Sequence, residues 1–318
     1  MAIRTPLSPG DLAPLLEAHG FAGVRSLQGI EAGTVNTSYS VDLVGGGRVF
    51  LRLYEQQGIE GAGEEARMLE LLASRGVMTP SPLRRLDGGV VTELHGKACV
   101  LFPFLEGRTL PQSSVTEEHT EAVGRALANL HLASSGLSRG TGRFGAAALL
   151  PHVRGMATHP SPDVRRLAPE LEGRLCAWDS AREPALPRGL VHGDLFRDNV
   201  LWHEGRIGAL LDFESAHDAP FVFDLAVSLL SWCYGGAFVW PLARAMVSGY
   251  DLVRPLGEVE RRGLLAEACF ACLRFTVTRI TDDTIRVGKD YRRFLARLAA
   301  LEALEAPGGP GLRHVLAL

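Results

Sequence analysis

The sequence of 318 residues predicts an α+β protein built from two lobes. Three observations support this fold class. The first hundred residues alternate short apolar runs with glycine-containing turns, which is typical of antiparallel strands. Most of the chain after residue 107 has the apolar spacing of amphipathic helices. The segment 103–107, between them, marks the change in character. We therefore predict a small sheet lobe over residues 1–102, a hinge over 103–107 and a larger, mainly helical lobe over 108–318.

The elements of the small lobe follow from periodicity and turn residues. Alternating apolar and polar residues mark its strands, and Gly45-Gly46-Gly47 is its clearest turn. Apolar residues every three or four positions mark its helices, and Ser8 or Asp11 can cap the first. In chain order we predict a helix over 12–18, a hairpin-like unit over 29–44, a strand over 48–54, a helix over 64–74 and a hairpin of 90–94 with 98–102.

The large lobe is predicted from three strong helical patterns and three short apolar strands. The helices cover 117–134, 264–280 and 290–304, and the strands 189–191, 200–202 and 207–211. A tight turn at residues 203–206 makes the last two strands a hairpin. The stretch 151–169 is rich in Pro, Gly and His, and we expect a mobile excursion there.

Composition and charge exclude several classes of protein. With 46% apolar and 22% charged residues the chain is typical of soluble globular proteins. A net charge of −3 without a Lys/Arg block argues against a nucleic-acid partner. The longest apolar stretch, 221–243, contains Asp224, two glycines and Pro241, and no signal peptide is evident. We expect no membrane segment and a cytoplasmic location; the sequence carries no indication of oligomeric state.

Five scattered cysteines, an odd number, suit a reducing compartment better than a disulfide framework. Cys269 and Cys272 form a C-x-x-C pattern but lie in an apolar helical segment without a second pair. We expect them to pack in the core rather than to bind a metal.

The most specific pattern is His192-Gly193-Asp194, followed by Asn199 and later by Asp212-Phe213. It has the spacing H-x-D-x-x-x-x-N then D-F-x of a kinase-type phosphoryl-transfer centre. Asn199 and Asp212 offer the oxygen ligands that Mg²⁺ prefers, and Asp194 can accept the proton of an acceptor hydroxyl. The predicted hairpin brings Asn199 and Asp212 to the same end, as a shared metal site requires. The alternative is a surface turn with fortuitous spacing, and it requires residue types, spacing and flanking strands all to coincide.

A nucleotide would suit the junction of the two predicted lobes. The segment 102–105, with Phe102, Phe104 and Leu105, leads into and through the hinge, and its backbone N–H and C=O groups can hydrogen-bond to adenine. An ordinary connector between a strand and a helix remains the alternative.

Several segments together resemble the aminoglycoside phosphotransferase/choline kinase superfamily, which shares the protein-kinase-like fold. Within it the resemblance is greatest to the homoserine kinase branch. The segments are 29–39, 127–133, 192–201, 223–226 with 231–233, 254–256, and 273–275 through 278–279 to 282. The catalytic segment is specific for the superfamily, whereas Arg254-Pro255-Leu256 and Leu273-Arg274-Phe275 point to the branch.

The resemblance implies roles for individual residues. Asp194 is similar to the catalytic base, Asn199 and Asp212 to the Mg²⁺ ligands, and His192 and Asp224 to the pair that braces the catalytic loop. The phosphate-covering turn would present ATP with the backbone near Gly33, Thr34 and Asn36.

Two departures from the family pattern concern ATP and the acceptor. Arg52 stands where kinases usually place a phosphate-binding Lys, and Glu65 is its expected partner. A surface Arg and a solvated Glu remain the alternative. The segment 213–218 departs from the homoserine kinase pattern, so the identity of the acceptor stays open.

Homoserine is a small zwitterion, and its site needs a cation for the carboxylate and an acid for the ammonium group. The candidates are Glu214, Asp218, Trp232, Arg274 and Arg279, each with a structural role as its alternative. Arg274 and Arg279 are five residues apart on a helix, so we expect only one of them to enter the site.

Three rival functions remain. An antibiotic phosphotransferase would want an acidic acceptor site, whereas residues 251–318 hold 11 basic and 9 acidic residues. A choline kinase would want an aromatic cage, and only 7% of the residues are aromatic. A nucleotide-binding pseudokinase would be expected to have lost Asp194, Asn199 or Asp212. The expected function is therefore ATP- and Mg²⁺-dependent phosphorylation of a small-molecule hydroxyl, with homoserine as the favoured acceptor, giving O-phosphohomoserine for threonine biosynthesis.

Overall fold

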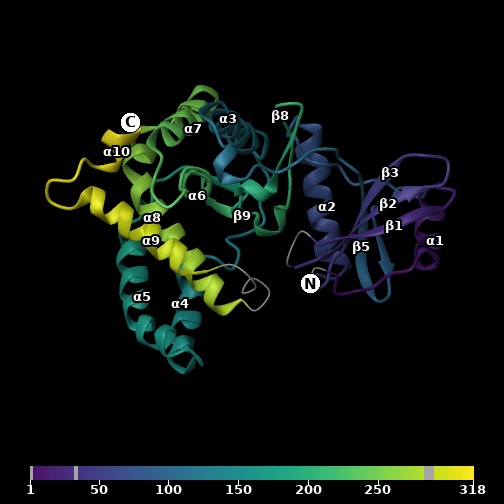
Figure 1. The fold of residues 1–318 in the computed structure, drawn as a ribbon, viewed down its shortest axis with the longest axis horizontal. Coiled ribbons are helices and arrows are strands. Elements are labelled where there is room, and N and C mark those ends of the chain that lie inside the picture. Colours follow the sequence, from purple (N-terminus) through teal and green to yellow (C-terminus); the bar gives the residue numbers. More distant parts are fainter. Residues whose placement is uncertain (1–2, 32–34, 283–289) are drawn as a thin grey trace. The chain divides into compact units, whose positions relative to one another are not determined.

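The computed structural model describes residues 3–31, 35–282 and 290–318. The chain divides into two compact units, one of Met1–Gly107 with Gly208–Leu211 and one of Arg108–Ile207 with Asp212–Leu318. The first holds a five-stranded antiparallel sheet and the second is mainly helical, which confirms the predicted α+β class (Figure 1).

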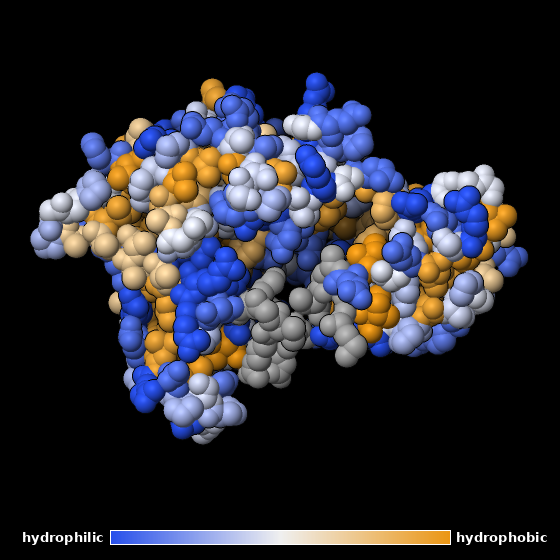
Figure 2. Space-filling model, in the orientation of Figure 1, coloured by the Kyte–Doolittle hydropathy of each residue, from blue (hydrophilic) through white to orange (hydrophobic). Residues whose placement is uncertain are grey.

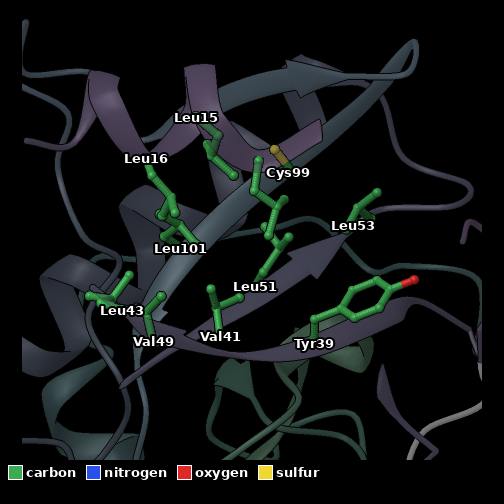
Figure 3. Close-up of a cluster of buried hydrophobic side chains, with 11 residues drawn as sticks. Leu15, Leu16, Tyr39, Val41, Leu43, Val49, Leu51, Leu53, Cys99 and Leu101 are labelled. Carbon is green, nitrogen blue, oxygen red and sulfur yellow. The ribbon is translucent and has the colours of Figure 1, made fainter. Parts of the chain in front are cut away.

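The sheet of the first unit has the strand order β1-β2-β3-β5-β4. Alternation on β3 sends Leu51 and Leu53 to one face, where they pack with Leu15 and Leu16 of α1 (Figure 3). Arg52 points to the other face, where it meets α2. The elements are η1 (Pro9–Leu12), α1 (Ala13–Ala18), β1 (Val24–Ile30), β2 (Thr37–Leu43), β3 (Arg48–Leu53), α2 (Ile59–Ser74), β4 (Val91–Leu94) and β5 (Lys97–Pro103).

The rest of the chain is mainly helical and contains two small strand pairs, β6 with β9 and β7 with β8. The strands are β6 (Arg188–Val191), β7 (Val200–His203), β8 (Arg206–Leu210), which continues into the segment assigned to the first unit, and β9 (His217–Pro220). The helices are α3 (Glu117–Ala133), α4 (Ala146–Gly155), α5 (Pro162–Ser180), α6 (Phe221–Trp232), α7 (Trp240–Val253), α8 (Glu258–Thr281), α9 (Arg292–Glu305) and the short α10 (Leu312–Leu316). Short 3₁₀ turns are η2 (Gln112–Ser114), η3 (Met156–Thr158), η4 (Arg197–Asn199) and η5 (Phe213–Ser215).

Helices α3 and α7 pack with their backbones in direct contact. A Cβ on Gly124 would lie 2.1 Å from the Met246 carbonyl oxygen, and one on Gly249 would lie 2.2 Å from that of Glu121. Two glycines therefore allow the close approach that places Tyr250 of α7 next to His131 of α3.

The structure adds regular helix at two places where the sequence analysis did not predict it. The stretch 151–169 is largely helical, because it covers the end of α4 and the beginning of α5. Pro162 occupies the first turn of α5, where the missing N–H has no helical partner to lose, and Pro151 and Pro169 are accommodated inside helices. Helix α2 also begins at Ile59, earlier than predicted, because Gly61 and Gly63 obscure its apolar pattern.

Other expectations are confirmed. The strands predicted at 90–94 and 98–102 pair as β4 and β5, and those at 200–202 and 207–211 pair as β7 and β8. Cys269 and Cys272 are fully buried in α8. Over the described residues, no helix combines the length and apolarity needed to cross a bilayer.

Candidate active site

The loop that follows β6 is held by Asp224, near the start of α6. One carboxylate oxygen accepts a hydrogen bond from the backbone N–H of His192 (2.7 Å), and the other accepts one from that of Gly193 (2.8 Å). Asp224 has no exposed surface. Burial raises its pKa, but the hydrogen bond from His131 and the loop amides outweigh this and keep the pKa below its usual value. The predicted bracing by His192 and Asp224 thus forms through the backbone of His192.

Behind Asp224 lies His131 of α3, which the sequence analysis did not single out. Its Nε2 lies 3.1 Å from Asp224 Oδ2, and its Nδ1 lies 2.7 Å from the hydroxyl of Tyr250. Complete burial lowers the pKa of His131, although Asp224 opposes the shift. The sequence analysis named the segment 127–133, which contains His131, among those that resemble the family. Nothing in the local pattern showed that this histidine would contact Asp224.

Gly193 allows the loop to turn sharply before Asp194. Its φ of +75° lies in the left-handed region. A Cβ at this position would lie 2.6 Å from the Ser215 carbonyl oxygen and 3.1 Å from the ring of His217. The Gly193 carbonyl accepts a hydrogen bond from Arg274 Nη1 at 3.0 Å. The backbone of Gly193 is thus held on both sides, because its N–H donates to Asp224 and its carbonyl accepts from Arg274.

The two predicted metal ligands follow the loop. The amide nitrogen of Asn199 donates to the Asp194 carbonyl at 2.8 Å, so its Oδ1 is the oxygen left for a cation. Asp212 has a φ of +64° and a ψ of 68°, a conformation that non-glycine residues adopt mainly at functional sites and turns. One amide oxygen and one carboxylate form a hard-oxygen donor set, which fits Mg²⁺.

A cavity of about 50 Å³ lies beside Asp194 within the second unit. Three arginines line it: Arg143, Arg274 and Arg279. The Arg274 guanidinium is sandwiched between the rings of Phe144 and Phe275, 3.9 Å from each centroid. Burial lowers the pKa of Arg274 to about 10, and Asp194 opposes the shift. The cavity therefore places three guanidinium groups next to the carboxyl group of Asp194.

The acceptor predictions are partly wrong. Both Arg274 and Arg279 line the cavity, although we expected only one to enter; the cavity runs along one turn of α8, and long side chains reach it from different faces. Trp232 has no exposed surface and donates to the Leu195 carbonyl at 3.0 Å, so it supports the loop from within. Asp218 accepts from the backbone N–H of Arg139 and of Gly140, both at 3.1 Å. We therefore assign structural roles to Trp232 and Asp218 in place of the predicted contact with the acceptor.

Glu214 lies in η5, and it is absent from the described residues that line the cavity. The cavity residues that the sequence analysis missed are Arg143, Phe144, Phe196, Ser215, Phe275 and Thr278. Phe196, Ser215, Phe275 and Thr278 lie in segments that the sequence analysis had named, whereas Arg143 and Phe144 reach the cavity from a distant part of the chain.

The candidate nucleotide-binding residues of the first unit are placed as follows. Arg52 Nη1 contacts Glu65 Oε1 at 3.3 Å, so the predicted pair forms, and the Tyr54 hydroxyl contacts the same oxygen at 3.2 Å. Asn36 Oδ1 accepts from the backbone N–H of Glu55 at 3.0 Å. Gly33 and Thr34 lie outside the described residues.

The hinge candidates lie at the C-terminal end of β5 and just after it. Phe102 is buried and lies opposite Phe50 in the pairing of β3 with β5. The Phe104 ring lies under the Arg48 guanidinium, 4.9 Å away, and Leu105 is half-buried. The Phe102 side chain thus belongs to the core, which leaves only its backbone for the predicted contact with adenine.

Comparison with known proteins gives concordant results. Residues 26–256 match the model of a phosphotransferase enzyme family. A homoserine kinase of Xanthobacter autotrophicus is 30% identical over 98% of this chain and 99% of its own length. A homoserine kinase of Brucella anthropi is 32% identical over 99% of this chain and 98% of its own.

The solved structure of an amicoumacin kinase in complex with AMP-PNP, Ca²⁺ and its ligand is similar with a TM-score of 0.70. It is 16% identical and matches 95% of this chain and 96% of its own. This similarity confirms the predicted kinase-like fold.

Proposed function

Because the chain belongs to the phosphotransferase enzyme family, we propose that it transfers the γ-phosphoryl group of ATP to the hydroxyl of L-homoserine. The products are ADP and O-phospho-L-homoserine. The observation that carries this proposal is the cavity in which Asp194 lies together with Arg143, Arg274 and Arg279. It joins a candidate proton acceptor to groups that bind a carboxylate.

The arginines favour an acceptor that carries a negative charge. A guanidinium group binds a carboxylate through two parallel hydrogen bonds. Arg274 already donates to the Gly193 carbonyl and is enclosed by two rings, so its main role is to hold the loop and to supply positive potential. Arg143 and Arg279 are the better candidates for direct contact with the carboxylate.

In the proposed reaction the acceptor oxygen attacks the γ-phosphorus, and the bond from that phosphorus to the oxygen bridging it to the β-phosphate breaks. The hydroxyl proton passes to the Asp194 carboxylate. The backbone of Asp194 is held at both ends, because its N–H donates to His192 Nδ1 at 3.3 Å and its carbonyl accepts from Asn199. This positions the carboxylate before the acceptor arrives.

Asn199 and Asp212 are the residues that would hold Mg²⁺. The bound ion would neutralise charge on the ATP phosphates during the transfer. Arg52, oriented by Glu65, is the residue proposed to contact a phosphate in place of the usual Lys. The amicoumacin kinase structure, which contains AMP-PNP and Ca²⁺, supports nucleotide and cation use in this fold.

An antibiotic kinase is the second candidate, since kinases of this fold phosphorylate such acceptors. Aminoglycosides are polycations, and three guanidinium groups beside Asp194 would repel them. Electrostatics therefore favour the carboxylate-bearing acceptor.

The test is ADP release from Mg·ATP with L-homoserine, L-threonine, L-serine, choline, kanamycin or water alone. We expect turnover with homoserine far above the water blank, and its loss in Asp194→Asn. A further acceptor, 3-aminopropan-1-ol, is homoserine without its carboxylate. Its kcat/KM should be about 10²-fold lower than that of homoserine, because two charge-assisted hydrogen bonds to the carboxylate are lost.

Turnover with kanamycin but not homoserine would refute the acceptor assignment. Equal kcat/KM for homoserine and 3-aminopropan-1-ol would refute the role of the arginines.

A further inference from the structure

A second, larger cavity of about 310 Å³ lies in the second unit, and Phe196 lines both it and the cavity beside Asp194. Its charged lining residues are Arg197, Arg279, Arg293, Arg297 and Asp198. Four arginines therefore face one aspartate, a formal charge of +3. Figure 2 shows hydrophilic residues gathered over α9, the helix that contributes Arg293 and Arg297.

Two of the arginines have a structural explanation. Arg197 Nε contacts the Ser231 carbonyl at 3.3 Å, and Arg297 Nε contacts the Leu230 carbonyl at 2.8 Å. These carbonyls lie in the last turn of α6, where helical hydrogen bonding ends and a cation is favourable. Arg197 and Arg297 therefore stabilise the end of α6.

The other two arginines are not explained in this way. Arg279 donates to the Asp290 carbonyl at 3.2 Å and lies over the Phe294 ring. Arg293 is exposed, and no hydrogen bond of its side chain is found within the described residues. Across residues 3–31, 35–282 and 290–318, no carboxylate forms an ion pair with any of the four arginines of this cavity.

Four guanidinium groups that face one carboxyl group, that of Asp198, repel one another. Burial, followed by the neighbouring Arg293, lowers the pKa of Arg279 to about 10, and burial lowers that of Arg297 to about 10. An oxyanion would relieve this repulsion, and the planar guanidinium group matches the geometry of carboxylate and phosphate.

We propose that this cavity binds a small oxyanion, a carboxylate or a phosphate group, through Arg279 and Arg293. Phe196 and Arg279 line both cavities. Occupancy of the larger cavity is therefore coupled to binding of the acceptor beside Asp194. The coupling rests on the proposed function, whereas the binding of the anion does not.

The test of binding is isothermal titration calorimetry with inorganic phosphate and, separately, succinate, without nucleotide and at constant ionic strength. We expect one saturable site, weakened about tenfold or more in Arg293→Gln by the loss of a charge-assisted hydrogen bond. The control is Arg292→Gln, at the residue that precedes Arg293 in α9. Arg292 is exposed and contacts Asp163 at 3.3 Å, and it does not line the cavity.

The control should bind both anions as the unsubstituted protein does. Absence of saturable binding, or equal weakening in the two variants, would overturn the proposal. Both positions are exposed, and thermal unfolding should show that both variants fold. Because the titration needs no turnover, it decides the anion site even if homoserine is not the acceptor.

Kinetics then distinguish two sources of the anion. If the acceptor's own carboxylate occupies the site, Arg293→Gln raises the KM for homoserine about tenfold and leaves that for 3-aminopropan-1-ol unchanged. If a free phosphate-bearing molecule occupies it, Arg293→Gln leaves both KM values unchanged without phosphate and removes the effect of added phosphate. Either pattern supports the site. No change in any KM, with or without phosphate, would refute the coupling.

Discussion

Replacing Gly193 by alanine should strongly lower kcat while the protein remains folded. The structure gives two separate costs for this change. A φ of +75° costs an alanine about 1–2 kcal/mol relative to right-handed conformations. In addition, the new methyl group would lie 2.6 Å from the Ser215 carbonyl oxygen, a backbone atom that cannot rotate away.

The second cost sets the size of the effect on turnover. Ordinary contact begins at about 3.4 Å, so the loop must shift by roughly 0.8 Å to accept the methyl group. A displacement of about 1 Å at a reacting group reduces rates by about 10²-fold. We therefore expect kcat to fall by about 10²-fold, equivalent to about 2.7 kcal/mol in the barrier.

Gly205 is a matched control. Its φ of +76° is within one degree of that of Gly193, but a Cβ there meets nothing within 4 Å. Gly205→Ala should thus lose about 1 kcal/mol of stability through backbone strain and keep its kcat. The assays are coupled ADP release at saturating substrates and thermal unfolding of both variants. A kcat for Gly193→Ala within about threefold of that for Gly205→Ala would refute the steric argument.

Three further predictions concern the same centre. Asp194→Asn should lower kcat by about 10²–10⁴-fold and leave the affinity for ATP unchanged, as measured by steady-state kinetics and nucleotide titration; retention of most turnover would exclude Asp194 as the base. Asp212→Ala should abolish Mg²⁺-dependent binding of ATP in calorimetry, and an unchanged affinity would remove it from the metal site. Burial lowers the pKa of both His131 and His217 in the folded protein, so the unfolded chain binds more protons below about pH 6.5. Stability should therefore be fully present above that pH and fall as the pH is lowered, by up to about 1.4 kcal/mol per unit for each histidine. Urea denaturation at pH 7.5 and 5.5 measures this, and a His131→Gln variant with the same pH dependence would exclude His131 as a contributor.

Short-range spacing explains what could be predicted from the sequence. The contact of Asn199 with Asp194 follows from local structure alone, because both residues lie on one loop. The pair Arg52–Glu65 was also predictable, because one strand and the next helix place them on the same face of the sheet. The roles of these residues stay predictions.

Long-range packing explains what could not be predicted. Arg143 and Phe144 reach the cavity only because the chain before α4 lies against α8. His131 joins the site through the close packing of α3 and α7, which depends on two glycines. Trp232 was a candidate for the acceptor site, yet its Nε1 donates to the carbonyl of Leu195 inside the core.

The contacts of Asp224 also determine how the catalytic loop exchanges its amide hydrogens with solvent. The N–H groups of His192 and Gly193 both donate to a carboxylate with no exposed surface. Neither can meet deuterated water unless α6 separates from the loop and from α3. Their exchange should therefore require the opening that exposes the helical core, and these two amides should be as slow as those in the middle of α6. A loop at the reactive centre would thus report the stability of the whole unit rather than its own local fluctuation.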